Sequence, residues 1–358
     1  MKILFLANDD GGFYRFRKDL VEQLLSDGHH IAISFPRGKY AGYFEKLGCE
    51  FFDTPIDRRG INPAKDFKLL QSYKKLIKST KPDLVITYTI KPNIYGAIAA
   101  RHLRTEYAVN ITGLGTAFEK GGIIRSLVVN LYRYSLKKAK VIFFENSGNR
   151  DVMVSFRCCK SERTYVLHGA GVNTERFSYI AFPQNTIPRF LFIGRVMKEK
   201  GIEELISATK NLIGNGVQCH LDVVGPLEED YRNLLEQFEK EEWFSYYGIQ
   251  EDVRPFIAAC DCFVLPSYHE GMANTILECA SSGRPVVTSN IPGCREGIIE
   301  GKTGFLCEPK NPESIYNAMK KIIESPNLEE MGRCGRAHMI EVFDKKKVVA
   351  ETIAQIMR

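Results

Sequence analysis

Several sequence patterns that mark particular classes of protein are missing from this chain. The ten cysteines form no CxxC pair and have no His-rich cluster beside them, so a zinc site is not expected. No apolar run is long enough to cross a bilayer, because the opening run of residues 3–7 stops at Asn8. That run is also too short for a secretory signal and has no small-residue cleavage site after it. These absences predict a cytoplasmic protein whose thiols are reduced and structural.

The GxGxxG fingerprint of dinucleotide-binding proteins is missing as well. Residues 8–12 (NDDGG) follow the first apolar run, and residues 35–37 (FPR) stand where a ribose-binding acid would be expected. An NAD-linked dehydrogenase is therefore not expected. Gly11 and Gly12 would still let the backbone approach a ligand closely, as in a phosphate-binding turn, although a plain tight turn has the same sequence.

Length and charge indicate two domains with different partners. A chain of 358 residues exceeds what one hydrophobic core usually serves. Residues 1–165 carry 28 basic and 16 acidic side chains, giving +12, whereas residues 166–358 carry 21 and 27, giving −6. The first half is therefore expected to face something anionic: a membrane surface, a nucleic acid or a phosphorylated substrate.

Short apolar runs alternate with longer helical patterns along the whole chain. Strands are predicted in the first half over residues 2–7, 30–35, 49–54, 83–88, 107–112 and 141–146. In the second half they are predicted over residues 189–194, 220–225, 243–248, 262–267, 285–290 and 304–309. Helices are predicted over residues 14–26, 64–79, 94–103, 123–138, 312–324 and 345–358. Nearly continuous apolar strands favour parallel sheets covered on both faces.

The domain organisation follows from one break in this alternation. Residues 178–188 (SYIAFPQNTIP) lose the periodicity and contain two prolines, so an interdomain linker is predicted there. We predict a basic N-terminal domain over 1–177, a C-terminal domain over 189–340, and a final helix (341–358) packing back toward the first domain. Each domain is predicted to be an α/β, Rossmann-like, doubly wound parallel sheet, the two facing each other across a cleft. Ligands of such sheets bind beyond the carboxyl ends of the strands.

The loop after the first strand of the second half carries two cations. Residues 194–201 (GRVMKEKG) place Arg195 at the end of the strand and Lys200 five residues later. An arginine forks onto phosphate oxygens and a lysine supplies a point charge, so the pair suits a diphosphate. Two solvated surface charges would have the same pattern.

Two glutamates flank a predicted helix start at Ala273. The helix's free N–H groups and dipole form an anion site, and Gly271 allows close backbone approach. A phosphate bound there would leave Glu270 to accept from a sugar hydroxyl. Glu278, about a turn and a half into the helix, would accept from a ribose diol. In the alternative, Glu270 is a helix N-terminal charge and Glu278 an ordinary exposed residue.

Together these motifs resemble a known family. The spacing of Glu270 and Glu278, residues 194–201 and residues 292–298 (PGCREGI) resemble the large retaining glycosyltransferases of GT-B architecture, family four. Residues 88–118 (YTIKPNIYGAIAAR…NITGLGTAF) resemble a narrower group of bacterial enzymes that extend undecaprenyl-diphosphate-linked sugars for capsule, O-antigen or protein glycosylation. The resemblance spans essentially the whole chain.

The resemblance implies residue roles. Glu270, Arg195 and Lys200 would be catalytic: the two cations would hold the diphosphate of a UDP-sugar beside Gly194, and Glu270 would contact the donor sugar. Glu278 would bind the ribose. The phosphate would be bound by backbone at Gly271, Met272, Ala273, Asn274 and Thr275. From the opposite domain, the donor would be covered by Gly11 and Gly12, and the acceptor side would include Lys91, Asn110, Thr112 and Gly113.

No general base is identified by this comparison. Many relatives have a histidine after the fifth strand of the first domain, where this chain has residues 110–113 (NITG). In the retaining mechanism proposed for such enzymes, the departing phosphate oxygen itself takes the acceptor's proton, and the protein supplies orientation and charge stabilisation. This mechanism requires no metal and no cofactor, and Asp9-Asp10 is the only nearby carboxylate pair.

A basic amphipathic pattern covers residues 123–140 (IIRSLVVNLYRYSLKKAK). A helix of this type can lie on an anionic bilayer surface, or it can pack on its own sheet. The acceptor-side basic patch would also include Arg58, Arg59, Lys91, Arg101 and Arg104.

The sequence thus predicts a cytoplasmic glycosyltransferase peripheral to the inner face of the plasma membrane. It would move a hexose or N-acetylhexosamine, of the galactose, N-acetylgalactosamine or N-acetylglucosamine type, from a UDP-sugar to a lipid-diphosphate-linked saccharide with retention. One alternative is a UDP-sugar 2-epimerase of the same architecture. Another is a non-enzymatic basic-surface binding protein, although no aromatic–basic stacking motif indicates nucleic acid.

Overall fold

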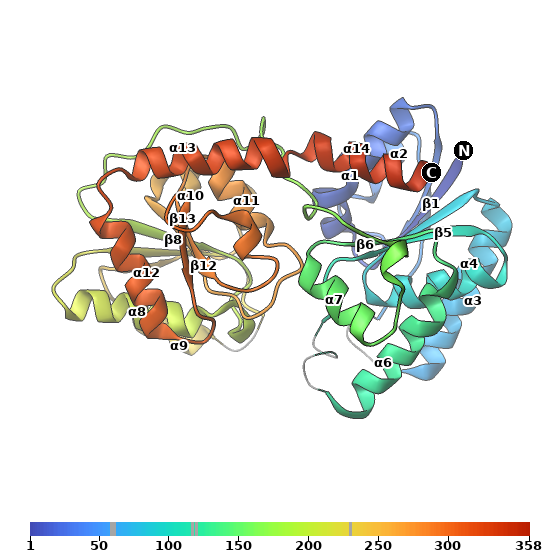
Figure 1. The fold of residues 1–358 in the computed structure, drawn as a ribbon, viewed down its shortest axis with the longest axis horizontal. Coiled ribbons are helices and arrows are strands. Elements are labelled where there is room, and N and C mark those ends of the chain that lie inside the picture. Colours follow the sequence, from blue (N-terminus) through green and yellow to red (C-terminus); the bar gives the residue numbers. More distant parts are fainter. Residues whose placement is uncertain (58–61, 116–117, 119–120, 229–230) are drawn as a thin grey trace. The chain divides into compact units, whose positions relative to one another are not determined.

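The computed structural model describes residues 1–57, 62–115, 118, 121–228 and 231–358. Arg58 and Arg59, predicted above to belong to a basic patch, lie outside the described residues, as do residues 116 and 117 of the segment 88–118. The chain forms two compact units: Met1–Ala170 with Lys347–Arg358, and Gly171–Lys346. Each unit is an α/β domain built on a parallel sheet, as predicted (Figure 1).

The first unit contains a seven-stranded parallel sheet in the order β3-β2-β1-β4-β5-β6-β7. Its strands are β1 (Lys2–Leu6), β2 (His30–Phe35), β3 (Glu50–Asp53), β4 (Leu84–Tyr88), β5 (Glu106–Ile111), β6 (Val141–Phe144) and β7 (Thr164–Val166). β7 is a three-residue, half-buried edge strand, and such a short run gave no periodic signal.

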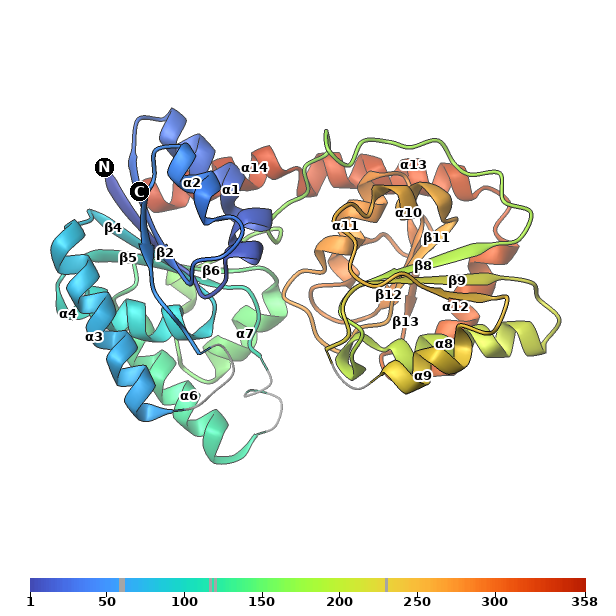
Figure 2. The ribbon, with the colours of Figure 1, turned by 180° about the vertical axis from the view of Figure 1, so that it is seen from behind.

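Helices cover both faces of this sheet (Figure 2). One core forms under α1 (Asp10–Ser26), α2 (Ala41–Lys46) and α14 (Lys345–Met357). The other forms under α3 (Pro63–Thr80), α4 (Ala97–His102) and α6 (Gly122–Ser135), with a π-helical turn over Pro92–Gly96 before α4. α7 (Ser147–Ser155) packs on β6 and β7. Strands buried on both faces explain the unbroken apolar runs.

The second unit contains a six-stranded parallel sheet in the order β10-β9-β8-β11-β12-β13. Its strands are β8 (Arg189–Ile193), β9 (His220–Val224), β10 (Phe244–Tyr246), β11 (Cys262–Leu265), β12 (Val286–Ser289) and β13 (Gly304–Cys307). Cys260 and Cys262 are fully buried in its core, and none of the ten cysteines forms a disulfide.

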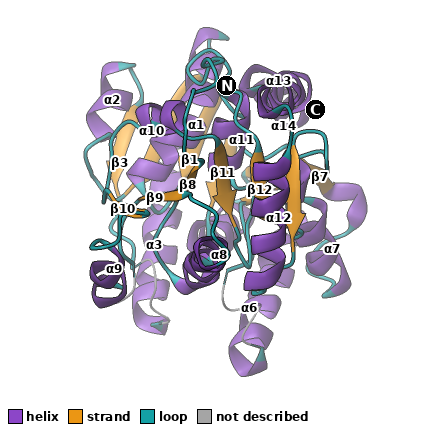
Figure 3. Cartoon of the chain, turned by 90° about the vertical axis from the view of Figure 1, so that its left-hand side faces the viewer, coloured by secondary structure: helices purple, strands orange, loops and turns teal. Residues whose placement is uncertain are grey.

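Helices lie on both faces of this sheet too (Figure 3). They are α8 (Ile202–Gly214), α9 (Arg232–Phe238), α10 (Arg254–Ala259), α11 (Asn274–Ser281), α12 (Pro312–Glu324) and α13 (Leu328–His338). α13 was not predicted, because Gly332 and Gly335 weaken its helical signal. Those glycines face its neighbours: a Cβ on Gly332 would lie 2.0 Å from the carbonyl oxygen of Gly283.

The chain divides at a different place from the predicted linker. Residues 171–188 belong to the second unit, where Arg284 and Arg336 hold them through backbone carbonyls. The Arg336 guanidinium donates to the carbonyls of Phe177 and Thr174. Residues 178–188 lack periodicity because they run as a strap over this unit rather than as a free connection.

Arg284 is the largest fully buried side chain, and its guanidinium bonds backbone on two sides. It donates to the strap at Ile180 (3.0 Å) and Ala181 (3.0 Å), and to the α10 carbonyls of Ile257 (2.8 Å) and Ala258 (3.1 Å). A buried charge of this kind is tolerated only when it is fully hydrogen-bonded.

Arg284→Met is expected to lower the free energy of unfolding by at least about 3 kcal/mol, because it leaves these carbonyls without donors. Urea denaturation of both proteins measures the difference. Arg254→Ala, which changes an exposed arginine of the same unit, is the control and should leave stability nearly unchanged. Equal stability of the two variants would contradict the strap assignment.

Candidate active site

The second sheet has a topological switch point between β8 and β11. From β8 the chain proceeds to β9 and β10 on one side, and β11, β12 and β13 lie on the other. Loops leaving β8 and β11 therefore separate at the carboxyl edge of the sheet, which is where doubly wound sheets bind ligands. The predicted second-half residues all lie on these two loops or on α11, which follows the β11 loop.

The loop after β8 presents Arg195 to solvent. The Gly194 N–H donates to the Val224 carbonyl (2.9 Å), and the buried Val196 donates to Pro226 (2.8 Å). The backbone is thus anchored on both sides of Arg195, whose own side chain is exposed. Among the described residues, no carboxylate pairs with its guanidinium, so an anionic ligand could bind it without first breaking an ion pair.

Lys200 and Glu270 meet at the switch point. The Lys200 ammonium bonds Glu270 Oε1, and the two side chains are 16% and 12% exposed. The Ser267 hydroxyl donates to the same oxygen at 2.7 Å. The sequence assigned both Lys200 and Glu270 to the site but did not predict that they pair, and it gave no role to Ser267.

The two loops touch along their backbones. Gly201 adopts φ +71°, and a Cβ there would lie 2.2 Å from the Pro266 carbonyl oxygen, so only glycine fits. The Tyr268 N–H donates to the Glu199 carbonyl (2.8 Å), and the Tyr268 hydroxyl donates to Glu204 (2.5 Å). These contacts hold Lys200 beside Glu270.

α11 begins at Asn274, one residue after the predicted start, and no side chain of the described residues caps it. Met272 and Ala273 are buried, and Gly271, Asn274 and Thr275 are half-buried. An uncapped helix start retains N–H groups and a positive dipole end that an anion can use. Glu278 lies on the second turn of α11 and is half-buried, whereas His269 is exposed.

The loop after β12 supports this helix start. The Ala273 N–H donates to the Gly293 carbonyl at 2.8 Å. Gly293 has φ +87°, and a Cβ there would lie 2.5 Å from the Gly271 oxygen and 2.8 Å from the Glu270 oxygen. The sequence indicated this loop only through resemblance. In the structure, the backbone of this loop packs closely against the backbone of Glu270 and Gly271.

Gly11 and Gly12 do not form the predicted loop. Both lie in the first turn of α1, which begins at Asp10 rather than near residue 14. The Gly12 N–H donates to the Asp9 carboxylate (2.9 Å), so this helix start already carries an anionic cap. Asp10 accepts from the Tyr40 N–H at 3.1 Å. In the described part of the chain, no three His, Cys, Asp or Glu side chains gather as a metal site would require.

The predicted acceptor-side residues of the first unit lie at the ends of β4 and β5. Asn110 is buried, and its amide donates to the Thr87 carbonyl at 3.3 Å. Thr112 and Gly113 are half-buried in the loop after β5. Lys91 forms an ion pair with Asp66. The Asn110 side chain is thus buried against β4, and its place on the acceptor side stays a prediction.

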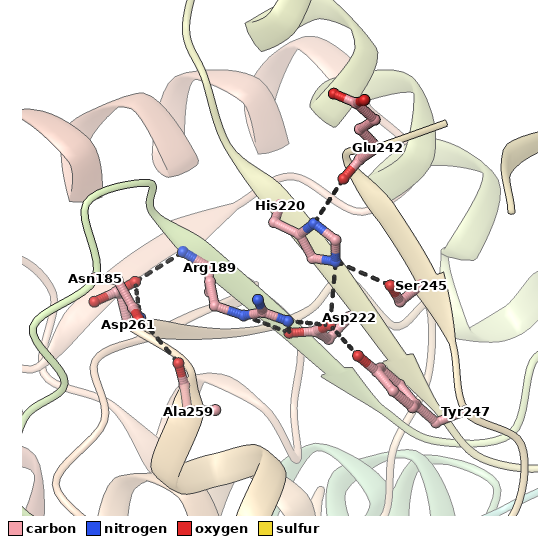
Figure 4. A network of polar contacts seen from close by, with 9 residues as sticks. All are labelled: Asn185, Arg189, His220, Asp222, Glu242, Ser245, Tyr247, Ala259 and Asp261. Atoms are coloured by element: carbon pink, nitrogen blue, oxygen red, sulfur yellow. Dashed lines mark hydrogen bonds and ion pairs between the residues drawn. The ribbon is translucent and has the colours of Figure 1, made fainter. Parts of the chain in front are cut away.

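A cluster at the amino-terminal ends of β8, β9 and β10 has the residue types of a nucleophilic triad but not its geometry (Figure 4). His220 Nε2 faces both Ser245 (3.1 Å) and Asp222 (3.3 Å), while Nδ1 faces the Glu242 carbonyl (3.0 Å). A triad needs serine and carboxylate on opposite ring nitrogens. Asp222 also binds Arg189, so the cluster joins three strands.

This cluster predicts an acid-sensitive contribution to stability. Burial alone would raise the pKa of the Asp222 carboxyl, but hydrogen bonds from His220 and Arg189 hold that pKa below its ordinary value. Its stabilisation is therefore complete above the unfolded pKa of about 3.9 and is lost as pH falls through the lower folded pKa. We expect Asp222→Asn to cost roughly 3 kcal/mol at pH 7. Urea titrations should show the difference shrinking as the pH falls below about 3.9, and a constant difference would contradict this interpretation.

Two doubly wound units, one with cations beside an uncapped helix at its switch point, define a Rossmann-type α/β protein with a site suited to an anionic ligand. Residues 2–146 match the glycosyl transferase 4-like family model, and residues 176–338 match the model of glycosyl transferases group 1. The chain therefore belongs to the GT-B glycosyltransferases. This membership favours transfer chemistry over both alternatives considered from the sequence.

Individual relatives are glycosyltransferases too. The chain is 24% identical over 345 residues to N,N'-diacetylbacillosaminyl-diphospho-undecaprenol alpha-1,3-N-acetylgalactosaminyltransferase of Campylobacter jejuni, covering 92% of this chain and 91% of the relative. It is 27% identical over 330 residues to UDP-Gal:alpha-D-GlcNAc-diphosphoundecaprenol alpha-1,3-galactosyltransferase of Escherichia coli, covering 87% and 84%. The crystal structure of Anabaena HepE with UDP and glucose superposes with a TM-score of 0.82 at 18% identity, covering 100% and 99% of the chains.

Proposed function

We propose that this glycosyltransferase moves a hexose or N-acetylhexosamine from a UDP-sugar to a saccharide carried on a polyprenyl diphosphate, with retention of configuration. The observation that carries the donor assignment is that the loop bearing Arg195 and Lys200 and the uncapped start of α11 lie at one switch point. The acceptor class is supported by the names of the Campylobacter and Escherichia relatives, which act on diphospho-undecaprenol-linked sugars.

Donor binding would replace the ion pair between Lys200 and Glu270 with a contact between Lys200 and the donor diphosphate. In the protein alone, Lys200 is neutralised by Glu270. A diphosphate bound at the start of α11 would compete for the Lys200 ammonium, and Glu270, still bonded by Ser267, would then accept from the donor sugar's hydroxyls. Donor binding would in this way orient the sugar at the moment that the phosphate is clamped.

We propose a chemical step in which the acceptor attacks on the face that the phosphate leaves. The bond between the anomeric carbon and the β-phosphate oxygen breaks, and a bond to the acceptor hydroxyl oxygen forms on the same face of the sugar. The hydroxyl proton passes to the departing phosphate oxygen, and UDP leaves. Arg195, Lys200 and the N–H groups of α11 stabilise the charge that develops on the leaving group.

Incubation with UDP-sugars, with and without a polyprenyl-diphosphate-linked saccharide, tests the proposal. We expect a lengthened lipid-linked product only when the acceptor is present, with an anomeric configuration that matches the donor. Conversion of UDP-N-acetylglucosamine without acceptor would instead indicate an epimerase. Salt-sensitive nucleic-acid binding without nucleotide-sugar affinity would indicate a basic-surface binding protein.

We further propose that α6 holds the first unit on an anionic membrane surface. One face of α6, at Val129 and Tyr132, is buried in the core of the first unit, whereas Ile123, Ile124 and Leu127 are 89%, 49% and 48% exposed. Residues 121–140 contain no acidic side chain and include Arg125, Arg133, Lys137, Lys138 and Lys140. No described helix is long and apolar enough to span a membrane. Apolar side chains beside basic ones favour binding in the plane of the interface.

Ile123→Glu combined with Leu127→Glu is expected to weaken binding to phosphatidylglycerol-containing vesicles by at least about tenfold, because charges replace inserting apolar groups. Co-sedimentation measures the bound fraction. Ile249→Glu, at a 73% exposed isoleucine of the second unit, is the matched control and should bind normally. Salt at about 0.5 M should weaken wild-type binding. Unchanged binding of the double variant would refute the assignment of α6.

A further inference from the structure

The first unit also has a switch point, between β1 and β4. From β1 the chain proceeds to β2 and β3 on one side, and β4 to β7 lie on the other. The loop after β4, Thr89–Lys91, therefore occupies the position at which doubly wound sheets bind ligands. The loop after β1 cannot supply an anion site there, because Asp9 already caps α1.

The loop after β4 is held in a strained conformation. Thr89 has φ +72°, a region that β-branched residues rarely adopt. A π-helical turn, Pro92–Gly96, follows, and such turns occur frequently at functional sites. Buried bonds fix both features: Thr87 donates to Asn93 (2.8 Å), and Asn93 donates to the Asn110 carbonyl (2.8 Å). Strain that the surroundings enforce so firmly points to a binding or catalytic role.

Lys91 is the charged residue of this loop, and Asp66 holds it. The Lys91 ammonium lies 2.8 Å from Asp66 Oδ1, and the side chains are 13% and 9% exposed. The Tyr95 hydroxyl donates to Asp66 Oδ2 at 3.1 Å. Burial and Asp66 raise the pKa of Tyr95 to about 12, so this donor stays protonated at neutral pH. Asp66 therefore fixes Lys91 and Tyr95 with one oxygen each.

The neighbouring loop completes the edge. Gly115, after β5, has φ +71°, and a Cβ there would lie 2.9 Å from Ile90 Cδ1. The loops after β4 and β5 thus lie side by side at Gly115 and Ile90, and Thr112 and Gly113 of the second loop are half-buried. The Lys91 ammonium has three N–H donors, of which Asp66 takes one.

The Lys91–Asp66 ion pair is expected to add little to the stability of the fold. A part-buried ion pair loses about as much in desolvation as it gains, and an apolar pair of equal volume would serve the fold as well. A lysine held by a carboxylate at the ligand edge of a sheet does suit a phosphate, which can accept from the remaining donors.

We infer that Lys91 binds the diphosphate of the lipid-linked acceptor and that Asp66 is the positioning residue that aims it. This inference rests on the proposed function. The Lys91 ammonium would donate to the phosphate oxygens of the acceptor. The acceptor diphosphate would then lie at the switch point of the first unit.

Three variants distinguish acceptor binding by Lys91 from a purely structural role of its ion pair. They are Asp66→Asn, Lys91→Met and the charge-neutral double variant. Each single variant is expected to lower Tm by about 5 °C or more, because it leaves one charge without its partner. The double variant should recover most of that Tm. Its KM for the acceptor should nevertheless stay at least about tenfold above wild type, with the donor KM within about twofold. Recovery of the acceptor KM in the double variant would show a structural pair only and would overturn the inference.

A matched ion pair provides the control. Lys2 and Glu50 pair at 2.6 Å in the same unit, at the amino-terminal ends of β1 and β3. Lys2→Met combined with Glu50→Gln should leave both KM values unchanged, and an equal acceptor effect there would also overturn the inference. If the wild-type protein transfers no sugar, both the proposed function and this inference are wrong. If the protein is active but its acceptor KM does not change when Lys91 is replaced, only the inference is wrong.

Discussion

Arg195→Ala is expected to lower sugar transfer by roughly a thousandfold while leaving the melting temperature close to wild type. Removing one preorganised donor that stabilises a developing anion costs about a hundred- to a thousandfold in rate. The fold should tolerate the change, since Arg195 is exposed and its backbone is anchored through Gly194 and Val196. Steady-state kinetics with saturating donor and acceptor measure the loss.

Arg254→Ala is the control for this experiment. Arg254 is an exposed arginine at the start of α10, in the same unit but away from the switch-point loops. We expect wild-type turnover from it. Wild-type turnover from Arg195→Ala, or an equal loss in both variants, would show that Arg195 is not part of the active site.

Glu278→Gln is expected to raise the Kd for UDP by about a hundredfold. A carboxylate accepts from both hydroxyls of a ribose diol, whereas an amide offers one accepting oxygen and leaves one hydroxyl bonded less well. Each hydrogen bond to a charged group contributes about 1.5–3 kcal/mol, which corresponds to this loss. Isothermal titration with UDP measures the effect on the full chain.

Two comparisons make the Glu278 result specific. Glu324→Gln changes an exposed glutamate at the end of α12 and should leave the Kd for UDP unchanged. Inorganic diphosphate, which lacks the ribose, should bind wild type and Glu278→Gln equally. A Kd for diphosphate that rises as much as the Kd for UDP would mean that Glu278 does not contact the ribose.

Strand positions and the start of α11 were predictable because their signals are local. Strands buried on both faces need continuous apolar residues, and Gly271 followed by the run from Ala273 marks a helix start. The order of the strands then places the loops after β8 and β11 at one edge. From the sequence, Arg195, Lys200 and Glu270 were assigned to one site through the family resemblance, and this assignment stays a prediction.

Contacts between distant residues were not predictable from the same signals. Lys200 and Glu270 are 70 positions apart, and no periodic pattern indicates that they pair. Arg284 reaches the strap at Ile180 across 104 positions, so the strap resembled a linker in sequence. Gly11 and Gly12 suggested a loop, but the Asp9 cap outweighs their low helix propensity.

A crystal structure of the full chain with UDP tests the central claim most directly. The account predicts diphosphate oxygens within hydrogen-bonding distance of the Arg195 guanidinium, the Lys200 ammonium and the first N–H groups of α11, with the ribose hydroxyls on Glu278. UDP bound elsewhere, with Lys200 still paired to Glu270 and the start of α11 without a phosphate, would contradict it.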